Sequence, residues 1–366
     1  MKIRADALMI RRMHMQALVL VAATLTLGAG DAGAQVAIDA PTIYRLNPAS
    51  SFQQGCFPPC LCPIRLGDGV RGTLVLAASG FDGLFNNYTV TDVNWTVNLG
   101  DQALGVTGSG TYKVGGEFAV QQQLGLDLKV GDDPVQHFDS GLVPGGGQFP
   151  DISVTISIHG QVCFDTVFVV DATPAPTEQI HPYALLPEST LQRGCFPPCL
   201  CPLEEPRPMS GTFALVDLGQ GPLFTEFAVV NVDWLVSASG WSPGMPVRGV
   251  GTYRVGGEFA AQQQLSLDLI VNDEDQAHFD SGLVLGGGEF PLINSLISIA
   301  GMRCFDTVID LHAQPVDGVV GGSPLSARTS SPAVIGAKAR YQVATALKAD
   351  GVLSLRGHGT ARPGHR

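Results

Sequence analysis

The nonapeptide GCFPPCLCP occupies residues 55–63 and returns without a change at residues 194–202. Downstream, residues 111–150 match residues 252–291 in 29 of 40 positions. A repeat this long indicates duplicated whole domains rather than a solenoid of small units. We therefore expect two tandem homologous domains, each of a size that can bury its own core. The expected boundaries are an N-terminal segment 1–34, a first domain 35–173, a linker 174–181, a second domain 182–315 and a C-terminal tail 316–366.

The N-terminal segment has the order of features found in an export signal. Lys2, Arg4, Arg11 and Arg12 precede an apolar run at 15–27, and the small residues Ala32-Gly33-Ala34 follow it. This order predicts a cleaved signal peptide over residues 1–34. No later segment approaches the roughly 20 apolar residues of a membrane-spanning helix. We expect an exported protein, periplasmic or extracellular, with no integral membrane segment after signal cleavage.

The eight cysteines fall into two matched sets of four. The first set is Cys56, Cys60, Cys62 and Cys163, and the second is Cys195, Cys199, Cys201 and Cys304. Disulfides are expected in an exported protein. Pairing Cys60 with Cys62 is disfavoured because one intervening residue strains the bridge. We expect Cys163 to bond one cysteine of the N-terminal cluster and the other two to bridge locally, with the partner of Cys163 left open.

The alternative for the same cysteines is a metal-binding protein that uses the CxxxCxC clusters. Thiolates are ligands for zinc and for soft metal ions. Zinc knuckles, however, have CxxC spacing, and Pro58 and Pro59 restrict the backbone between the first two cysteines. We expect disulfides, no metal and no cofactor.

Composition and periodicity predict an all-β fold. The chain has 45 Gly and 25 Pro in 366 residues, and its apolar residues alternate with polar ones over several segments. One such segment puts apolar residues on one parity, expected to be buried: Phe118, Val120, Leu124, Leu126, Leu128 and Val130. We expect each domain to be a β-sandwich filled by Trp95 or Trp234, with an eight-strand barrel as the alternative.

The charge is distributed unevenly. Residues 35–319 hold 10 Lys and Arg against 30 Asp and Glu, whereas residues 320–366 hold 7 against 1. An acidic body argues against nucleic acid as a partner, because that affinity comes from clustered Lys and Arg on phosphates. The tail is rich in Gly, Ser, Ala and Pro, a low-complexity composition typical of disorder.

One repeated motif carries catalytic residue types. HFDSGLV places His137, Asp139 and Ser140 in the first domain and His278, Asp280 and Ser281 in the second. On a strand, residues two apart share a face and adjacent ones do not, so Ser140 points away from the other two. A hydrolase triad is therefore not assembled locally. We expect no enzyme, and hydrolysis stays a less favoured alternative.

Two acidic turns contain oxygen ligands of the kind that calcium prefers. They are Asp132-Asp133 and Asn272-Asp273-Glu274-Asp275. Their spacing matches no EF-hand, and we expect solvated polar turns rather than calcium sites. No nucleotide-binding or zinc-protease motif is present in the sequence.

Several segments together resemble a group of exported bacterial proteins that carry this cysteine block in a β-rich domain. The segments are 44–63, DVNWTV, GTYKVGGEFA, HFDSGLV and CFDTVF. The resemblance covers both domains and stops before the tail. It implies export and the domain organisation, and it transfers no activity. We expect a non-catalytic structural or binding protein that acts on an envelope or extracellular polymer or protein.

Overall fold

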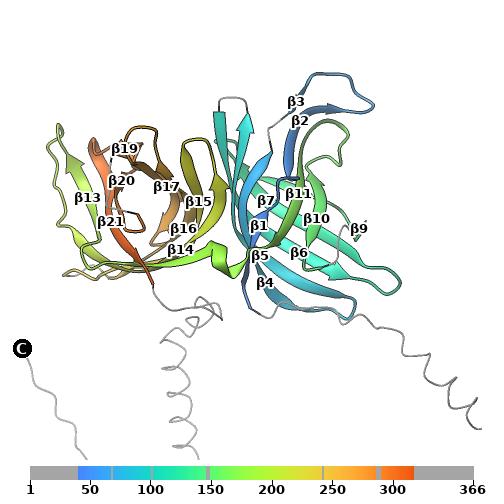
Figure 1. Cartoon of the computed structure of the whole chain (residues 1–366), viewed down its shortest axis with the longest axis horizontal. Helices are drawn as coiled ribbons and strands as arrows, with labels where there is room; N and C mark the ends of the chain where they lie inside the picture. The colour runs from blue at the N-terminus through green and yellow to red at the C-terminus, as the bar shows by residue number, and fades with distance from the viewer. Residues whose placement is uncertain are drawn as a thin grey trace, which may run out of the picture.

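The computed structural model describes residues 40–66, 69–99, 102–145, 149–240, 243–285 and 290–316. The expected signal peptide at 1–34 and all but Val316 of the expected tail lie outside these residues. Within them, the chain forms two β domains that lie side by side (Figure 1). The one helical element is η1 (Thr177–Gln179), and no described helix has the length and apolar character needed to span a membrane.

The first domain is one sheet of eleven strands, and the order of the strands in the sheet differs from their order in the chain. The strands are β1 (Thr42–Leu46), β2 (Ser51–Phe57), β3 (Ile64–Leu66), β4 (Val70–Phe81), β5 (Phe85–Leu99), β6 (Gln102–Gly115), β7 (Gln121–Val130), β8 (Gln136–Asp139), β9 (Val143–Pro144), β10 (Ile152–Ser157) and β11 (Cys163–Pro174).

The second domain repeats this arrangement with ten strands. They are β12 (Ile180–Leu185), β13 (Thr190–Phe196), β14 (Arg207–Gln220), β15 (Phe224–Val236), β16 (Met245–Gly256), β17 (Gln262–Val271), β18 (Ala277–Asp280), β19 (Val284–Leu285), β20 (Ile293–Ser298) and β21 (Cys304–Pro315). The strand β3 has no counterpart strand here and is replaced by a single bridge between Gly194 and Leu203.

In each domain the path of paired strands closes on itself. In the first, β1 pairs with β4 on one side and with β11 on the other; in the second, β12 pairs with β14 and β21. The core lies inside this closed path and includes Trp95 and Trp234, each 1% exposed. The all-β fold in two homologous domains is confirmed: opposing parts of one sheet enclose the core as in a sandwich, and the extra pairing joins the edges.

The hairpin between β6 and β7 shows that the predicted burial of two residues is wrong. The register pairs Gly115 with Gln121, so residues 116–120 form the turn. Phe118 and Val120 are therefore 95% and 54% exposed, although their parity predicted burial. Alternation predicts burial only where strand pairing continues, and here it stops at Gln121.

The two domains pack through the outer faces of their first strands. Ile43 on β1 and Val75 on β4 join four buried residues of the second domain: Ala214, Val216, Ala228 and Val230. Residues 174–181, expected as a linker, run directly into β12, and the Ala175 N–H donates to the carbonyl of Ile43 at 2.8 Å. An apolar cluster shared by both domains holds them in a fixed relation.

Polar contacts extend the same interface. Asn94 on β5 is 6% exposed, and its side-chain amide donates to two carbonyls of the second domain, Gly251 at 2.6 Å and Val229 at 3.3 Å. Arg71 pairs with Glu226 at 2.6 Å. Because the donors and acceptors come from different domains, these bonds fix the relative orientation of the two domains as well as the contact between them.

Candidate functional site

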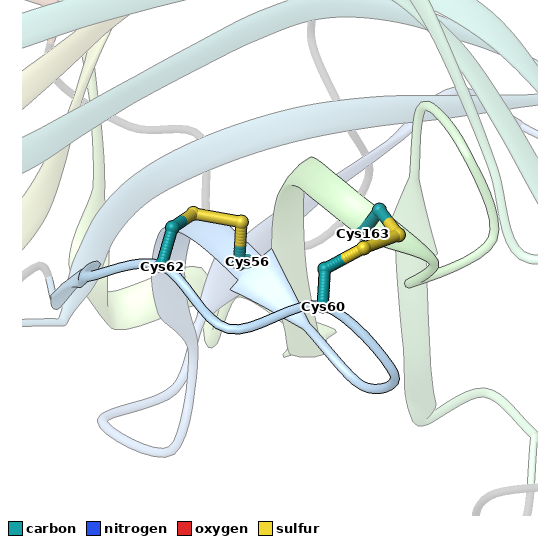
Figure 2. Close-up of a disulfide and its surroundings, with 4 residues drawn as sticks. All are labelled: Cys56, Cys60, Cys62 and Cys163. Carbon is teal, nitrogen blue, oxygen red and sulfur yellow. A yellow bond between two sulfur atoms is a disulfide. The ribbon is translucent and has the colours of Figure 1, made fainter.

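Four disulfides staple the termini of the two domains. Cys163 at the start of β11 bonds Cys60, and Cys56 bonds Cys62 (Figure 2). The second domain repeats this pairing with Cys199–Cys304 and Cys195–Cys201. The presence of disulfides is confirmed, and of the pairings left open the structure has the one that joins Cys60 to Cys163. All eight sulfurs are in disulfides, so in this form none can act as a thiolate ligand, and the metal-binding hypothesis would require the reduced protein.

The most developed polar cluster lies on the outer face of β17 and β18. On β17, Leu265, Leu267 and Leu269 point into the core, so Gln264, Ser266 and Asp268 point outward. The register places Asp268 opposite His278 and Ser266 opposite Asp280. Strand alternation thus gathers one imidazole, one hydroxyl and two carboxylates on one face.

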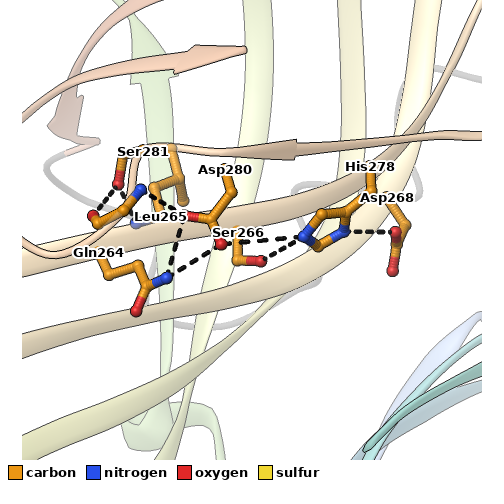
Figure 3. Close-up of polar contacts among 8 residues, drawn as sticks. Gln264, Leu265, Ser266, Asp268, His278, Asp280 and Ser281 are labelled. Carbon is orange, nitrogen blue, oxygen red and sulfur yellow. Dashed lines mark hydrogen bonds and ion pairs between the residues drawn. The ribbon is translucent and has the colours of Figure 1, made fainter. Parts of the chain in front are cut away.

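The distances in this cluster link a serine, a histidine and an aspartate in series (Figure 3). Ser266 Oγ lies 3.2 Å from His278 Nε2, and His278 Nδ1 lies 2.9 Å from Asp268 Oδ1. Asp280 Oδ2 lies 3.8 Å from the same Nε2 atom. The order of groups matches that of a serine-hydrolase triad, with a second carboxylate added beside the imidazole.

The second carboxylate changes the chemistry of the histidine. Hydrogen bonds to Asp268 and Asp280 raise the pKa of His278 to about 10, against a smaller opposing effect of burial. Burial raises the pKa of Asp280, but hydrogen bonds from His278, Gln264 and Gly282 outweigh it and lower that pKa to about 2. At neutral pH His278 is a cation and cannot accept the serine proton, which disfavours hydrolysis.

The first domain carries the same cluster without the serine. His137 Nδ1 lies 2.8 Å from Asp127 Oδ1, and His137 Nε2 lies 3.7 Å from Asp139. Gly125 occupies the position of Ser266. A histidine flanked by two aspartates is therefore common to both domains, and the hydroxyl beside it is specific to the second.

The cluster of the second domain opens into a groove between the domains. This groove has a volume of about 510 Å³ and is lined on one side by residues of β5 and β6, including Thr96, Gly105 and Thr107. On the other side it is lined by Thr252, Arg254, Gln264, Ser266, Asp268 and His278. The cluster of the first domain lines a separate, smaller hollow of about 260 Å³ on that domain alone.

The two serines of the HFDSGLV motif, considered for the less favoured hydrolase alternative, hydrogen-bond to the nearby backbone. Ser281 Oγ accepts from the N–H of Leu265 at 3.0 Å and donates to the carbonyl of Gly282 at 2.7 Å, and Ser140 makes the equivalent contacts. Asp139 and Asp280 accept from Gln123 and Gln264 at 2.9–3.0 Å. The structure brings the histidines together with Asp139 and Asp280, as the strand periodicity predicted, and leaves Ser140 and Ser281 in the following turn.

One residue of the second acidic turn, Glu274, has an ion-pair partner. Glu274 pairs with Arg193 through two hydrogen bonds of 3.0 and 2.9 Å, and these lower the pKa of Glu274. Among the described residues, no group of three or more His, Cys, Asp and Glu side chains converges on a point suited to a metal ion.

The sequence analysis missed Asp127, Asp268 and Ser266. Part of the signal was present, because LDL and HFD are both repeated: LDL places an aspartate between two buried leucines, and HFD places a buried phenylalanine between a histidine and an aspartate. What the sequence did not contain was the register that sets Asp268 opposite His278. Comparison with protein-family models, with curated proteins and with solved structures returned no match.

Proposed function

We propose that the protein is an exported, non-catalytic binding protein whose ligand site is the groove between its two domains. The observation that carries this proposal is the groove itself. It falls within the range of about 300–1,000 Å³ typical of ligand sites. Asn94 and the shared apolar cluster hold the two walls of the groove in position relative to each other. Binding sites between domains are common because two walls supply more contacts than one surface.

Export is supported by two independent features. The four disulfides indicate an oxidising compartment outside the cytosol. The basic, apolar and small residues of 1–34 have the order of a signal peptide. We propose the periplasm or the extracellular space as the location, and a polymer or protein of the envelope or its surroundings as the partner.

Gly105 offers a way to test the groove without disturbing the fold. It lies on β6, it is exposed, and a Cβ added there would meet no atom within 4 Å. A tyrosine at this position fills open space in the groove and is favoured in a strand. A matched control is Thr89→Tyr, at an exposed position of the neighbouring strand β5 that does not line the groove.

The experiment is co-sedimentation of the purified protein with an envelope and extracellular polymer fraction of the producing organism. We expect the wild type and Thr89→Tyr to be retained and Gly105→Tyr to lose at least tenfold in affinity. Equal retention of all three proteins would show that the groove is not the binding site.

A hydrolase is the second candidate, because the Ser266–His278–Asp268 order favours it. It predicts that Ser266→Ala abolishes a hydrolytic activity of the wild type towards a small activated ester. Our proposal predicts no difference between the two proteins at neutral pH, because a protonated His278 does not activate Ser266.

A further inference from the structure

Charge balance within the interdomain groove limits what it can bind. Its lining carries three cationic groups, Arg71, Arg254 and the protonated His278, against two carboxylates, Glu226 and Asp268, and Asp280 lies beside His278. Arg71 pairs with Glu226, and His278 lies between the two aspartates. Arg254 lies over the Phe224 ring and has no carboxylate partner among the described residues, so a charged ligand would meet at most this one unpaired charge, and it would lose its own hydration on entering.

Neutral donors and acceptors are plentiful along the same walls. Thr96, Thr107 and Thr252, which carry hydroxyls, line the groove, and so does Asn98, which carries an amide. Within the described part of the chain, none of these four side chains makes a hydrogen bond. Each hydroxyl can donate one hydrogen bond and accept two, and the amide can do both. The paired carboxylates and Arg254 supply further, stronger hydrogen bonds at fixed positions.

The backbone of the groove excludes a common mode of peptide binding. Its walls are largely the faces of β5, β6, β15, β16 and β17, and each of these strands is paired on both sides. An extended peptide binds by adding a strand to a free sheet edge, and these five strands offer none. Recognition must therefore come from side chains that hydrogen-bond a ligand rich in its own hydroxyls.

We infer that the interdomain groove binds a neutral polyhydroxylated chain, namely an oligosaccharide segment of an envelope or extracellular polysaccharide. This inference rests on the proposed function and specifies its ligand. Ser266 belongs to this site: protonated His278 donates towards Ser266 Oγ, so the serine hydroxyl proton is directed to another acceptor, and a sugar oxygen in the groove would be one.

The test uses the same polymer fraction after two separate treatments, with wild type, Thr89→Tyr and Gly105→Tyr measured in parallel. Periodate cleaves the vicinal diols of sugars and leaves the peptide backbone, and protease does the reverse. We expect Gly105-dependent retention to disappear after periodate, to survive protease, and to involve a glycan that passes an anion exchanger unretained at neutral pH.

Two results would overturn the ligand class and leave the proposed function standing. One is Gly105-dependent retention that survives periodate and is lost after protease, which would identify a protein partner. The other is a released glycan that the anion exchanger retains, which would identify an acidic polymer. Retention that Gly105→Tyr does not change would instead overturn the proposed function itself.

Discussion

At the scale of single residues, aspartates have two different roles in this fold. One pair keeps a histidine protonated, and another aspartate holds the backbone of a hairpin. Half-buried Asp268 and Asp280 raise the pKa of His278 to about 10 and so keep it protonated at neutral pH. Buried Asp165, 1% exposed, instead organises the backbone, because four N–H groups of the β10–β11 hairpin donate to it. Asp306 is its counterpart and accepts from the equivalent four positions.

The raised pKa of His278 predicts a pH-dependent contribution to stability. Its pKa is about 10 in the folded protein against an ordinary value of 6.5. A group with a raised folded pKa stabilises fully below its unfolded pKa, and this stabilisation is lost as pH rises through the folded value. We expect the difference in unfolding free energy between wild type and His278→Asn to be constant between about pH 4 and 6.5, to shrink between pH 6.5 and 10, and to shrink again below pH 3.8, where Asp280 becomes protonated in the unfolded chain.

The direct measurement is an NMR titration of the His278 imidazole. We expect its carbon-bound protons to titrate near pH 10, and His278→Asn identifies their signals. A midpoint near 6.5 would show that the two carboxylates do not hold the proton, and it would restore His278 as a candidate base.

Replacement of Asp165 tests its structural role. Asp165→Ala leaves the N–H groups of half-buried Ile158, exposed Gln161 and buried Thr166 without their acceptor, and the loss at a buried group costs about 1–3 kcal/mol. Because the turn can partly relax, we expect a total of about 3 kcal/mol in urea unfolding. Asp133→Ala, in an exposed turn, is the control and should stay within about 0.5 kcal/mol. Equal stability of the two variants would contradict this role.

At the scale of elements, the sequence predicted strands and hairpins better than it predicted their partners. The hairpin of β10 and β11 follows from alternation over residues 152–158, and burial of Leu124, Leu126 and Leu128 follows from the same rule. Phe118 and Val120 do not follow this rule, because they lie in the turn between Gly115 and Gln121, outside the paired part of the strands. Alternation specifies which face a residue occupies and carries no information on the register between distant strands.

The disulfide pairing of the cysteine cluster likewise depends on register, which the sequence does not specify. Its spacing excluded one pairing but could not choose between the other two, since that choice depends on where β11 meets β2. The register places Cys163 opposite Phe57, and Cys60 follows in the turn after β2. The short bridge Cys56–Cys62 closes the same loop locally.

The two kinds of disulfide are expected to differ in their effect on stability. Cys60–Cys163 spans 103 residues and Cys56–Cys62 spans 6. On loop-closure entropy, removal of the first costs about 4–5 kcal/mol and removal of the second about 2 kcal/mol. We expect Cys60→Ser/Cys163→Ser to unfold at clearly lower denaturant concentration than Cys56→Ser/Cys62→Ser, with the wild type above both. The opposite order would mean that the long bridge is not the main staple.

At the scale of the whole molecule, the contact between the domains determines the groove, and this contact could not be predicted from the sequence. Asn94 is buried against Gly251 and Val229, whereas its counterpart in the repeat, Asp233, is exposed. Duplication made the domains alike, and differences such as Asn94 against Asp233 distinguish the surfaces that pack. A single sequence shows such differences but does not show which of them face another domain.

Asn94→Asp tests this interface with a change of nearly constant shape. The new carboxylate would face two carbonyl oxygens to which the amide now donates. Such a buried unpaired charge should weaken the interface by about 2–3 kcal/mol. We expect a larger radius of gyration in small-angle scattering and separate unfolding transitions for the two domains. The matched control is Asp233→Asn, which changes the exposed counterpart and should leave both quantities as in the wild type. An unchanged radius for Asn94→Asp would show that the domains are held by other contacts.

The central claim is that ligand binds between the domains, and hydrogen–deuterium exchange with and without the polymer fraction tests it most directly. We predict protection in peptides that cover residues 94–107 and 251–268, which form the two walls of the groove. Protection confined to the cysteine loops, or to the hollow of the first domain around His137, would contradict the account.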